Sequence, residues 1–445
     1  MKPEINRDSI ATTALLPKSQ PPENEIAGTS SLSGAVFNVS TSMVGAGIMS
    51  VPATLKVLGI IPGFVMILIT AFVVEVTVEF LLRYTNYTGE ANTYGGVMAE
   101  SFGKFGSISL QLCVMITNLG ALIIYLIIIG DVLSGSQSDG VLHSGILQEC
   151  FGFHWWNSRA YSVLFVVIFV MLPLLLLPRV ESLCHASAVS ILLAVVFVVI
   201  ISGMAVYAML EGKTQELRLI PDFGDGFSFF NLFTTIPVLA TALACHVTIH
   251  PVRAELENQS DMTSAVRISL ILSVAIYFAV GFVGYLLFGD SIMADMLVNF
   301  DETSNSPGGL VINAVVRLSY AVHLMLVFPV IFYTLRANMD EMIFQQKSLL
   351  AHDTTRFVSL TCVLLAFIYF VAIAIPNIWY FFQFMGSTTV SCIAFIFPAA
   401  IVLRDVHGIS SRKDRVMAIM VVVLAVVTSG IAISTNLYSS IGNST

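Results

Sequence analysis

Runs of hydrophobic residues, separated by short polar stretches, follow one another along nearly the whole chain. A helix needs roughly 20 apolar residues to cross the hydrocarbon core of a bilayer, which is about 30 Å thick. Eleven runs approach or exceed this length, although one is short and polar residues interrupt another. The pattern therefore predicts eleven transmembrane helices, at 33–58, 60–83, 108–133, 161–177, 185–210, 228–250, 266–288, 309–335, 357–375, 379–403 and 416–435.

The composition supports a protein that exposes most of its surface to the lipid bilayer. Hydrophobic residues make up 56% of the chain and charged residues only 11%, whereas a soluble protein carries about 25% charged residues. The mean hydropathy is +0.88. The formal net charge of −8 and the absence of a basic cluster exclude a nucleic-acid-binding protein.

The sequence carries none of the motifs that an enzyme or a metal site would need. We find no phosphate-binding loop of the form GxxxxGK[ST], no HExxH zinc motif and no GxSxG nucleophile motif. The six cysteines are scattered without a CxxC pair, so we expect neither a disulfide framework nor structural zinc. We therefore expect no enzyme, no metal and no cofactor.

Basic residues in the loops orient the chain, because cytosolic loops of membrane proteins are enriched in Lys and Arg. With the amino terminus in the cytosol, 15 of the 20 Lys and Arg fall on the cytosolic side, four on the opposite side, and Arg317 within a span. The predicted organisation is a disordered cytosolic tail at 1–32, spans one to five at 33–210, spans six to ten at 228–403, an eleventh span at 416–435, and a luminal or extracellular tail at 436–445.

The acidic balance belongs mainly to one side of the membrane. On the cytosolic side, the 15 basic residues meet 15 acidic residues. On the opposite side, which we call luminal, four basic residues meet 11 acidic residues and leave a balance of −7. The acidic balance is therefore nearly all a property of one face rather than of the whole protein.

Two of the predicted spans carry residues that interrupt helices. The first contains Asn38 and several hydroxyl residues before the Gly45-Ala46-Gly47 triplet, and the sixth contains Pro237, the stretch Ala244–Cys245–His246 and Pro251. Small residues at such spacing also allow close helix packing. However, interrupted spans at matching positions of two halves indicate a transporter built from inverted repeats, with its substrate site near the bilayer midplane.

Three stretches of the sequence resemble the amino acid/auxin permease family, especially its vacuolar and sodium-coupled neutral amino acid transporter branches. The first is Val36-Phe37-Asn38-Val39-Ser40 with Val44-Gly45-Ala46-Gly47-Ile48, the second is Ala244-Cys245-His246 with Ile249-His250-Pro251, and the third is Arg317-Leu318 with Phe328-Pro329-Val330. The resemblance covers about residues 33–435. It implies an all-α membrane fold of five plus five helices in inverted repeats, like that of the amino acid permeases and LeuT, with one extra helix.

An amino acid substrate brings a carboxylate and an ammonium group, and the site must replace the water that both lose. The amino end of a half-helix offers N–H groups to the carboxylate, and carbonyl groups freed at a break can receive the ammonium. Following the resemblance, we assign the carboxylate to Gly45, Ala46, Gly47 and Ile48, and the ammonium to carbonyls near Thr41 and Ser42 and around Ala244, Cys245 and His246.

Coupling to sodium is less well supported than coupling to protons. The sodium-coupled relatives carry an Asn in the first segment and hydroxyl residues in the eighth, and the matching positions here are Thr41, Met325 and Val327. Apolar side chains cannot replace the oxygen ligands of a hard cation. The sequence therefore favours proton coupling or gradient-driven transport.

Candidate proton carriers are His246 and His323, because histidine titrates near physiological pH and both lie inside predicted spans. The simpler interpretation of each is a neutral ring that bonds a nearby carbonyl. Arg317 is a candidate gate residue, with Asp131 as one possible partner. Glu79 and Arg83, one helical turn apart, are best interpreted as a structural ion pair, with a proton relay as the alternative.

The sequence thus predicts a secondary active transporter that moves amino acids, neutral ones in our expectation, from the vacuole or a related compartment into the cytosol by alternating access. We expect a monomer, with protons rather than sodium as the coupling ion. Two alternatives remain open at this point: sodium-coupled uptake at the plasma membrane, and an amino acid sensor that does not transport. The short tail and loops offer little surface for the partner that a sensor would need.

Overall fold

The computed structural model of the chain describes residues 31–45, 47–87, 93–138, 141–176, 183–221, 229–301, 307–344, 353–375 and 378–442. The tail at 1–30, Ala46 and the last residues 443–445 lie outside the described part of the chain.

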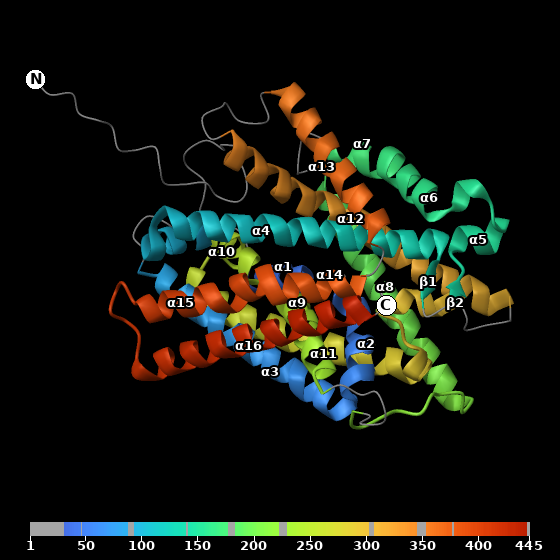
Figure 1. Cartoon of the computed structure of the whole chain (residues 1–445), viewed down its shortest axis with the longest axis horizontal. Helices are drawn as coiled ribbons and strands as arrows, with labels where there is room; N and C mark the ends of the chain where they lie inside the picture. The colour runs from blue at the N-terminus through green and yellow to red at the C-terminus, as the bar shows by residue number, and fades with distance from the viewer. Residues whose placement is uncertain are drawn as a thin grey trace, which may run out of the picture.

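In the first half of the chain, long helices run along the longest axis of the molecule, and a small hairpin lies at one end (Figure 1). The strands β1 (Ser136–Ser138) and β2 (Val141–His143) pair antiparallel in that hairpin, directly after α4. The helical elements of this half are α1 (Leu32–Met43), α2 (Gly47–Leu58), α3 (Ile60–Thr85), α4 (Tyr94–Ser134), α5 (Ile146–Phe151), η1 (Trp155–Asn157), α6 (Arg159–Val166), η2 (Val167–Met171), α7 (Leu172–Leu175) and α8 (Leu183–Leu210).

The second half begins with another interrupted helix and ends with two helices, α15 and α16, that pack against each other. Its helical elements are α9 (Asn231–Leu243), α10 (His246–Glu255), η4 (Gln259–Asp261), α11 (Met262–Phe288), η5 (Gly289–Ser291), η6 (Met296–Asp301), α12 (Pro307–Ile343), α13 (Thr354–Ala374), α14 (Ile378–Met385), η8 (Gly386–Val390), η9 (Cys392–Ile396), α15 (Phe397–Arg404) and α16 (Arg412–Gly442).

The helices account for the predicted membrane spans. In the described part of the chain, 9 helices are long and apolar enough to cross a membrane, and α1 with α2 forms a further span that bends by 60° at its break. The shorter apolar stretch Arg159–Leu175 corresponds to the predicted run at 161–177. The prediction of an all-α membrane protein with about eleven spans is confirmed. The boundaries of its two repeats stay a prediction.

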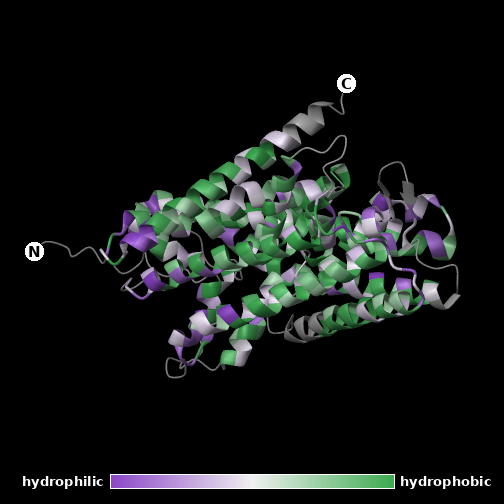
Figure 2. Cartoon of the chain, turned by 90° about the horizontal axis from the view of Figure 1, so that it is seen from below, coloured by the Kyte–Doolittle hydropathy of each residue, from purple (hydrophilic) through white to green (hydrophobic). Residues whose placement is uncertain are grey.

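The surface of the helical body is apolar, as a bilayer requires. Hydrophobic residues lie along the helices, and hydrophilic residues gather towards the ends of the molecule (Figure 2). Large apolar side chains such as Phe72, Phe165, Ile271 and Phe370 are more than half exposed in the middle of spans. Since such side chains gain nothing from water, this surface is the one that lipid covers.

The third span differs from its prediction at its cytosolic end. Helix α4 begins at Tyr94 rather than near residue 108, and Gly103 interrupts it with a positive φ of 66°. A side chain with a Cβ is strained in this conformation, whereas glycine adopts it freely. The hydrophobic run therefore predicted only the part of α4 that follows this kink.

The span predicted at 379–403 crosses the membrane without a break, although polar residues interrupt its sequence. It runs from α14 to α15 through two π-helical turns, η8 and η9. The wider turn at Gly386 lies against α9, where a Cβ on Gly386 would come within 2.1 Å of the Pro237 carbonyl oxygen. Glycine is thus required at position 386 so that this turn and α9 can approach each other closely.

Candidate functional site

The first span is interrupted where the glycines predicted it. Helix α1 ends at Met43, α2 begins at Gly47, and the Val44 N–H still bonds the Ser40 carbonyl at 2.9 Å. Beyond this point the i to i−4 pattern stops, because the Gly45 N–H donates to the Met43 carbonyl at 2.8 Å instead. The break therefore redirects main-chain polar groups in the middle of a span, where unpaired groups are tolerated only inside the protein.

The sixth span is interrupted in the same way at Ala244 and Cys245. Helix α9 ends at Leu243, the Ala244 backbone is extended with ψ of 112°, and α10 begins at His246. No side chain caps the amino end of α10, where Cys245 is the N-cap residue. The positive end of this helix dipole thus lies beside the break.

A tyrosine that the sequence analysis did not single out joins the two breaks. The Tyr277 hydroxyl of α11 lies 2.5 Å from the Met43 carbonyl oxygen and 2.8 Å from the Ala242 carbonyl oxygen. In continuous helices these two carbonyls would accept the N–H groups of Gly47 and His246. Because Tyr277 is fully buried and has one hydroxyl proton, it bridges both freed carbonyls and donates to one at a time.

Two further tyrosines converge on the first break. The Tyr320 hydroxyl of α12 donates to the Gly45 carbonyl at 2.7 Å. A Cβ on Gly45 would lie 3.2 Å from the Tyr125 hydroxyl of α4, so this ring faces the break as well. Hydropathy analysis hides these tyrosines, since each lies within a hydrophobic run. A tyrosine in the middle of a span, far from the membrane interface, is the signal that could have identified them.

The structure brings the two breaks together. Some main-chain groups that were assigned to the substrate instead form hydrogen bonds within the protein. The hydroxyls of Ser42 and Thr248 lie 3.1 Å apart, which places the two breaks side by side. The N–H groups of Gly45 and Ile48, assigned to the substrate carboxylate, instead bond the carbonyls of Met43 and Gly45. Of that assigned group, Gly47 is the described residue whose N–H has no partner within the described chain, and Ala46 lies outside it.

His246 lies next to the second break, 1% exposed, and its Nε2 is 2.9 Å from the Thr77 hydroxyl of α3. That hydroxyl also bonds main-chain carbonyls of α3 at 2.9 Å and 3.1 Å. When its single proton is donated to one of these carbonyls, the hydroxyl accepts from a proton on Nε2. The buried Nδ1 has no partner within the described chain, so in this tautomer its lone pair is unpaired.

His250, which the sequence analysis names only within the second family-like stretch, repeats this arrangement one turn further along α10. It is 3% exposed, and its Nε2 lies 2.9 Å from the Thr85 hydroxyl, which donates to the Leu81 carbonyl. Its Nδ1 is also buried without a partner in the described residues. Two neutral imidazoles thus form a row from the break towards the cytosolic end of α10.

His323, the other predicted proton carrier, is buried in α12 at 2% exposure. Its ring lies 5.1 Å from the ring of Tyr320, whose hydroxyl bonds the Gly45 carbonyl. His323 therefore contacts Tyr320, which bonds the first break, and is not part of the break itself.

Asp131, suggested as one possible partner of Arg317, does not pair with it. Arg317 is 2% exposed and pairs with Glu149 at 2.5 Å, and it also donates to the Ser144 carbonyl at 3.0 Å. Asp131 instead forms an ion pair with Arg159 of α6. The sequence could not reveal this, because Glu149 lies in the short helix α5 that the hairpin β1–β2 folds back towards α12. Arg317 of α12 thus connects its span to the short helix α5 at the luminal end.

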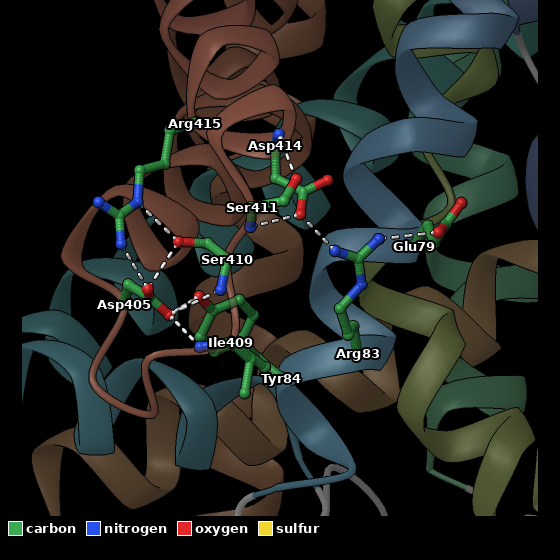
Figure 3. Close-up of polar contacts among 9 residues, drawn as sticks. All are labelled: Glu79, Arg83, Tyr84, Asp405, Ile409, Ser410, Ser411, Asp414 and Arg415. Atoms are coloured by element: carbon green, nitrogen blue, oxygen red, sulfur yellow. Dashed lines mark hydrogen bonds and ion pairs between the residues drawn. The ribbon is translucent and has the colours of Figure 1, made fainter.

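The interpretation of Glu79 and Arg83 as a structural ion pair agrees with the contacts at the cytosolic end. Arg83 bonds Glu79 at 2.9 Å and also Asp414 of α16 at 2.8 Å, as Figure 3 shows. Glu75 pairs with Arg267 of α11 at 2.7 Å. These pairs connect α3 to the first turn of α16 and to α11, so they brace the helices around the cytosolic end.

The two helices of the first span differ in exposure. On α1, the polar residues Asn38 and Ser42 are exposed, and Thr41 and Gly45 on the same face are partly exposed. On α2, which runs to the luminal side, Ser50 is 0% exposed. A stripe of polar residues at this depth needs water rather than lipid. The polar face of α1 is therefore the more exposed side of the break.

Comparisons with solved structures show the fold. MhsT in complex with L-phenylalanine matches with a TM-score of 0.53 at 12% identity, covering 90% of this chain and 97% of that chain. The inward-facing conformation of Mhp1 matches with a TM-score of 0.54, also at 12% identity, covering 93% of this chain and 92% of that one. Both likenesses extend over nearly the whole molecule and support the LeuT-like architecture.

Sequence comparisons identify the family. Amino acid transporter AVT6C of Arabidopsis thaliana is 54% identical over 97% of this chain and 99% of its own length. Vacuolar amino acid transporter 2 of Saccharomyces cerevisiae is 26% identical over 87% of this chain and 79% of its own length. The family described as transmembrane amino acid transporter protein matches residues 28–439. These relatives are transporters rather than enzymes, and the chain belongs to the transmembrane amino acid transporter protein family.

Proposed function

We propose that this protein is a secondary active transporter that moves neutral amino acids from the vacuole, or a related compartment, into the cytosol by alternating access. The observation that carries the proposal is the meeting of two interrupted helices around Tyr277, beside the Gly47 N–H, which has no partner within the described chain. The name of the yeast relative, vacuolar amino acid transporter 2, supports the vacuolar location.

The substrate binds between the two breaks. Its carboxylate accepts the Gly47 N–H at the amino end of α2, where the helix dipole is positive. Its ammonium group donates to carbonyls at the end of α1, at Thr41 and Ser42, and at Ala244 beside Cys245 and His246. Within the described chain, the Thr41 and Ala244 carbonyls accept no other hydrogen bond, so both retain the capacity to bind an ammonium.

Protons couple transport in this proposal, and His246 and His323 are the carriers. His246 has a free Nδ1 beside the second break, and His250 continues the row towards the cytosol. Sodium is disfavoured because the positions that hold oxygen ligands in sodium-coupled relatives are Met325 and Val327 here.

Counterflow in reconstituted vesicles tests the function. A panel of labelled amino acids is offered with and without imposed proton and sodium gradients. Exchange of neutral amino acids, with accumulation that follows the proton gradient, is the expected result. Loss of transport when choline replaces sodium would favour sodium-coupled uptake, and absence of any exchange would favour a sensor that does not transport.

Gly47→Leu tests the site within this assay. A Cβ on Gly47 would lie 2.8 Å from the Ala242 Cβ, so a larger side chain pushes the two breaks apart. We expect exchange to be abolished while the protein still reaches the membrane. Gly203→Leu is the matched control, because nothing lies within 4 Å of a Cβ at that position. Unaltered exchange in Gly47→Leu would contradict the placement of the substrate.

His246→Ala and His323→Ala test the coupling. If these histidines carry the proton, each variant alters the pH dependence of transport, because an alanine cannot titrate. Two variants that both keep the pH profile of the wild type would remove both residues from the proton pathway.

A further inference from the structure

A loop between α11 and α12 closes the luminal end of the molecule. Ser50 of α2 donates to its Ala294 carbonyl at 2.9 Å, and Lys56 to its Ile292 carbonyl at 3.3 Å. Asn299 braces the loop from inside, since its side chain bonds the Met293 N–H at 2.8 Å and the Ser291 carbonyl at 2.9 Å. The apolar residues of this loop are buried against the spans: Ile292, Met296, Leu297 and Phe300.

Asp295 places a carboxyl group inside this closed loop. It is only 3% exposed. One oxygen, Oδ1, accepts the Leu297 N–H at 3.0 Å. The other, Oδ2, is buried without a hydrogen-bond partner in the described part of the chain. An ionised carboxylate is rarely buried unless a cation or several donors balance it.

The charged groups around Asp295 do not supply that balance. The negative charge of Asp131 of α4 repels a negative charge on Asp295. Arg159 of α6 is already paired with Asp131 and with the Ile127 carbonyl. Lys56 of α2 donates to the main chain of the loop. Tyr320 of α12 also interacts electrostatically with Asp295, and His143 lies on β2, a strand that contacts η6. Of the other titratable groups on the packed elements, α12 carries His323 and Arg317, which is paired with Glu149, and α4 carries Tyr125.

The environment therefore favours the neutral form of the carboxyl group. Burial, and secondarily the negative charge of Asp131, raise the pKa of Asp295 well above its ordinary value. The Leu297 N–H and Arg159 act in the opposite direction but are outweighed. A protonated carboxyl could also place its hydrogen on the unpartnered Oδ2.

We propose that Asp295 is a luminal proton-binding site and that the loop closes over the transport site only when this carboxyl is protonated. The inference rests on the proposed function, in which the loop faces an acidic lumen. Luminal acidity thereby permits closure, and an alkaline lumen holds the loop open because closure would bury a negative charge.

The direction of the pH dependence follows from linkage. In the luminally open state Asp295 is in water, with an ordinary pKa of about 3.9, and closure raises this pKa. Between the two pKa values, closure takes up one proton, so its equilibrium constant falls by about tenfold for each unit of rising pH. Below both values the carboxyl is protonated in either state and the dependence disappears.

The Asp295→Asn variant, measured by exchange with equal pH on both sides of the vesicle, tests this site. An amide remains neutral and has nearly the shape of the protonated carboxyl. We expect wild-type exchange to slow as the pH rises, by up to about tenfold per unit where closure limits the rate, and exchange by Asp295→Asn to lose this dependence. The matched control is Asp290→Asn, because Asp290 lies in the same connection but is exposed and pairs with Arg218. It should keep the wild-type profile.

The two proposals fail in different ways. A wild-type protein that exchanges no amino acid contradicts the proposed function. A wild-type protein that exchanges amino acids, together with an Asp295→Asn variant that keeps the wild-type pH profile, overturns the proton site alone. If the variant is inactive, infrared difference spectra of the purified proteins decide. The carbonyl band of a buried protonated carboxyl must titrate in the wild type and be missing in Asp295→Asn, and an identical band in both overturns the proposal.

Discussion

At the residue scale, hydroxyl groups rather than charges organise the middle of the membrane. Tyr277 and Tyr320 bond carbonyls at the breaks, and Thr77 and Thr85 hold the two histidines of α10. Each of these groups replaces a bond that water would supply outside the membrane. A hydroxyl costs less to bury than a charge does. It can therefore bond a freed carbonyl without placing a charge in the membrane.

Tyr277→Phe should weaken transport without unfolding the protein. The ring is preserved, but the Ala242 carbonyl loses its side-chain donor and the Met43 carbonyl keeps only the Gly45 N–H. An unsatisfied buried carbonyl costs about 1–3 kcal/mol, so we expect about a tenfold or larger loss in transport efficiency, measured as initial rates over a range of substrate concentrations. Tyr285→Phe on the same helix is the control, because its hydroxyl bonds Asp290 near the luminal surface. Equal effects of both changes would contradict a special role of Tyr277.

At the element scale, the sequence predicted the helices and both breaks but not what holds the breaks in place. Hydrophobic runs and the residues around Gly47 and Ala244 carry local signals, because a break depends on residues within one segment. The partners of Arg317, Tyr277 and His250 come from other segments. Their contacts depend on how the helices pack, which the periodicity of one segment cannot encode.

The connection between α15 and α16 shows how a local signal and a distant partner combine. Asp405 ends α15 with a positive φ of 46°, a conformation that Asp tolerates at helix ends. Its carboxylate accepts hydrogen bonds from Tyr84 of α3 at 2.5 Å, from the Ser410 hydroxyl at 2.6 Å and from Arg415 at 2.9 Å, as drawn in Figure 3. This turn therefore fixes the extra helix α16 to the cytosolic end of α3.

Asp405→Asn should destabilise this attachment in a pH-dependent way. Burial alone would raise the pKa of Asp405, but hydrogen bonds from Ser410, Tyr84 and Arg415 outweigh it and hold the pKa well below its ordinary value. The carboxylate thus contributes stability above about pH 3.9 that is lost as the pH falls towards the lowered pKa. Asn accepts the same backbone conformation, so the change removes mainly the charge.

At neutral pH we expect Asp405→Asn to lower the free energy of unfolding by about 1–3 kcal/mol. Thermal unfolding of the purified protein measures this loss, which should shrink as the pH falls below about 4. Asp261→Asn in an exposed cytosolic loop is the control and should have little effect. A loss that stayed constant or grew in acid would contradict the stabilising role of the carboxylate.

At the scale of the whole molecule, the two ends differ in charge and in packing. The luminal basic residues are engaged within that face, Arg159 with Asp131, Arg218 with Asp290, and Lys213 with Glu211. The remaining acidic residues leave the luminal face negative, which concentrates cations and protons near the loop that carries Asp295. The cytosolic end has balanced charge and presents the exposed polar face of α1. Closure at one end and opening at the other are the expected halves of alternating access.

Accessibility of two serines on the first span tests this view of the whole molecule. Ser42 lies on α1, exposed towards the cytosol, and Ser50 lies on α2, 0% exposed beneath the luminal loop. In vesicles with the cytosolic face outward, a membrane-impermeant thiol reagent should label Ser42→Cys well above the parent protein and leave Ser50→Cys unlabelled. If the amino acid binds between the breaks as proposed, substrate should slow the labelling of Ser42→Cys. Faster labelling of Ser50→Cys, or labelling of Ser42→Cys that substrate leaves unchanged, would show that the pathway to the cytosol does not run along α1.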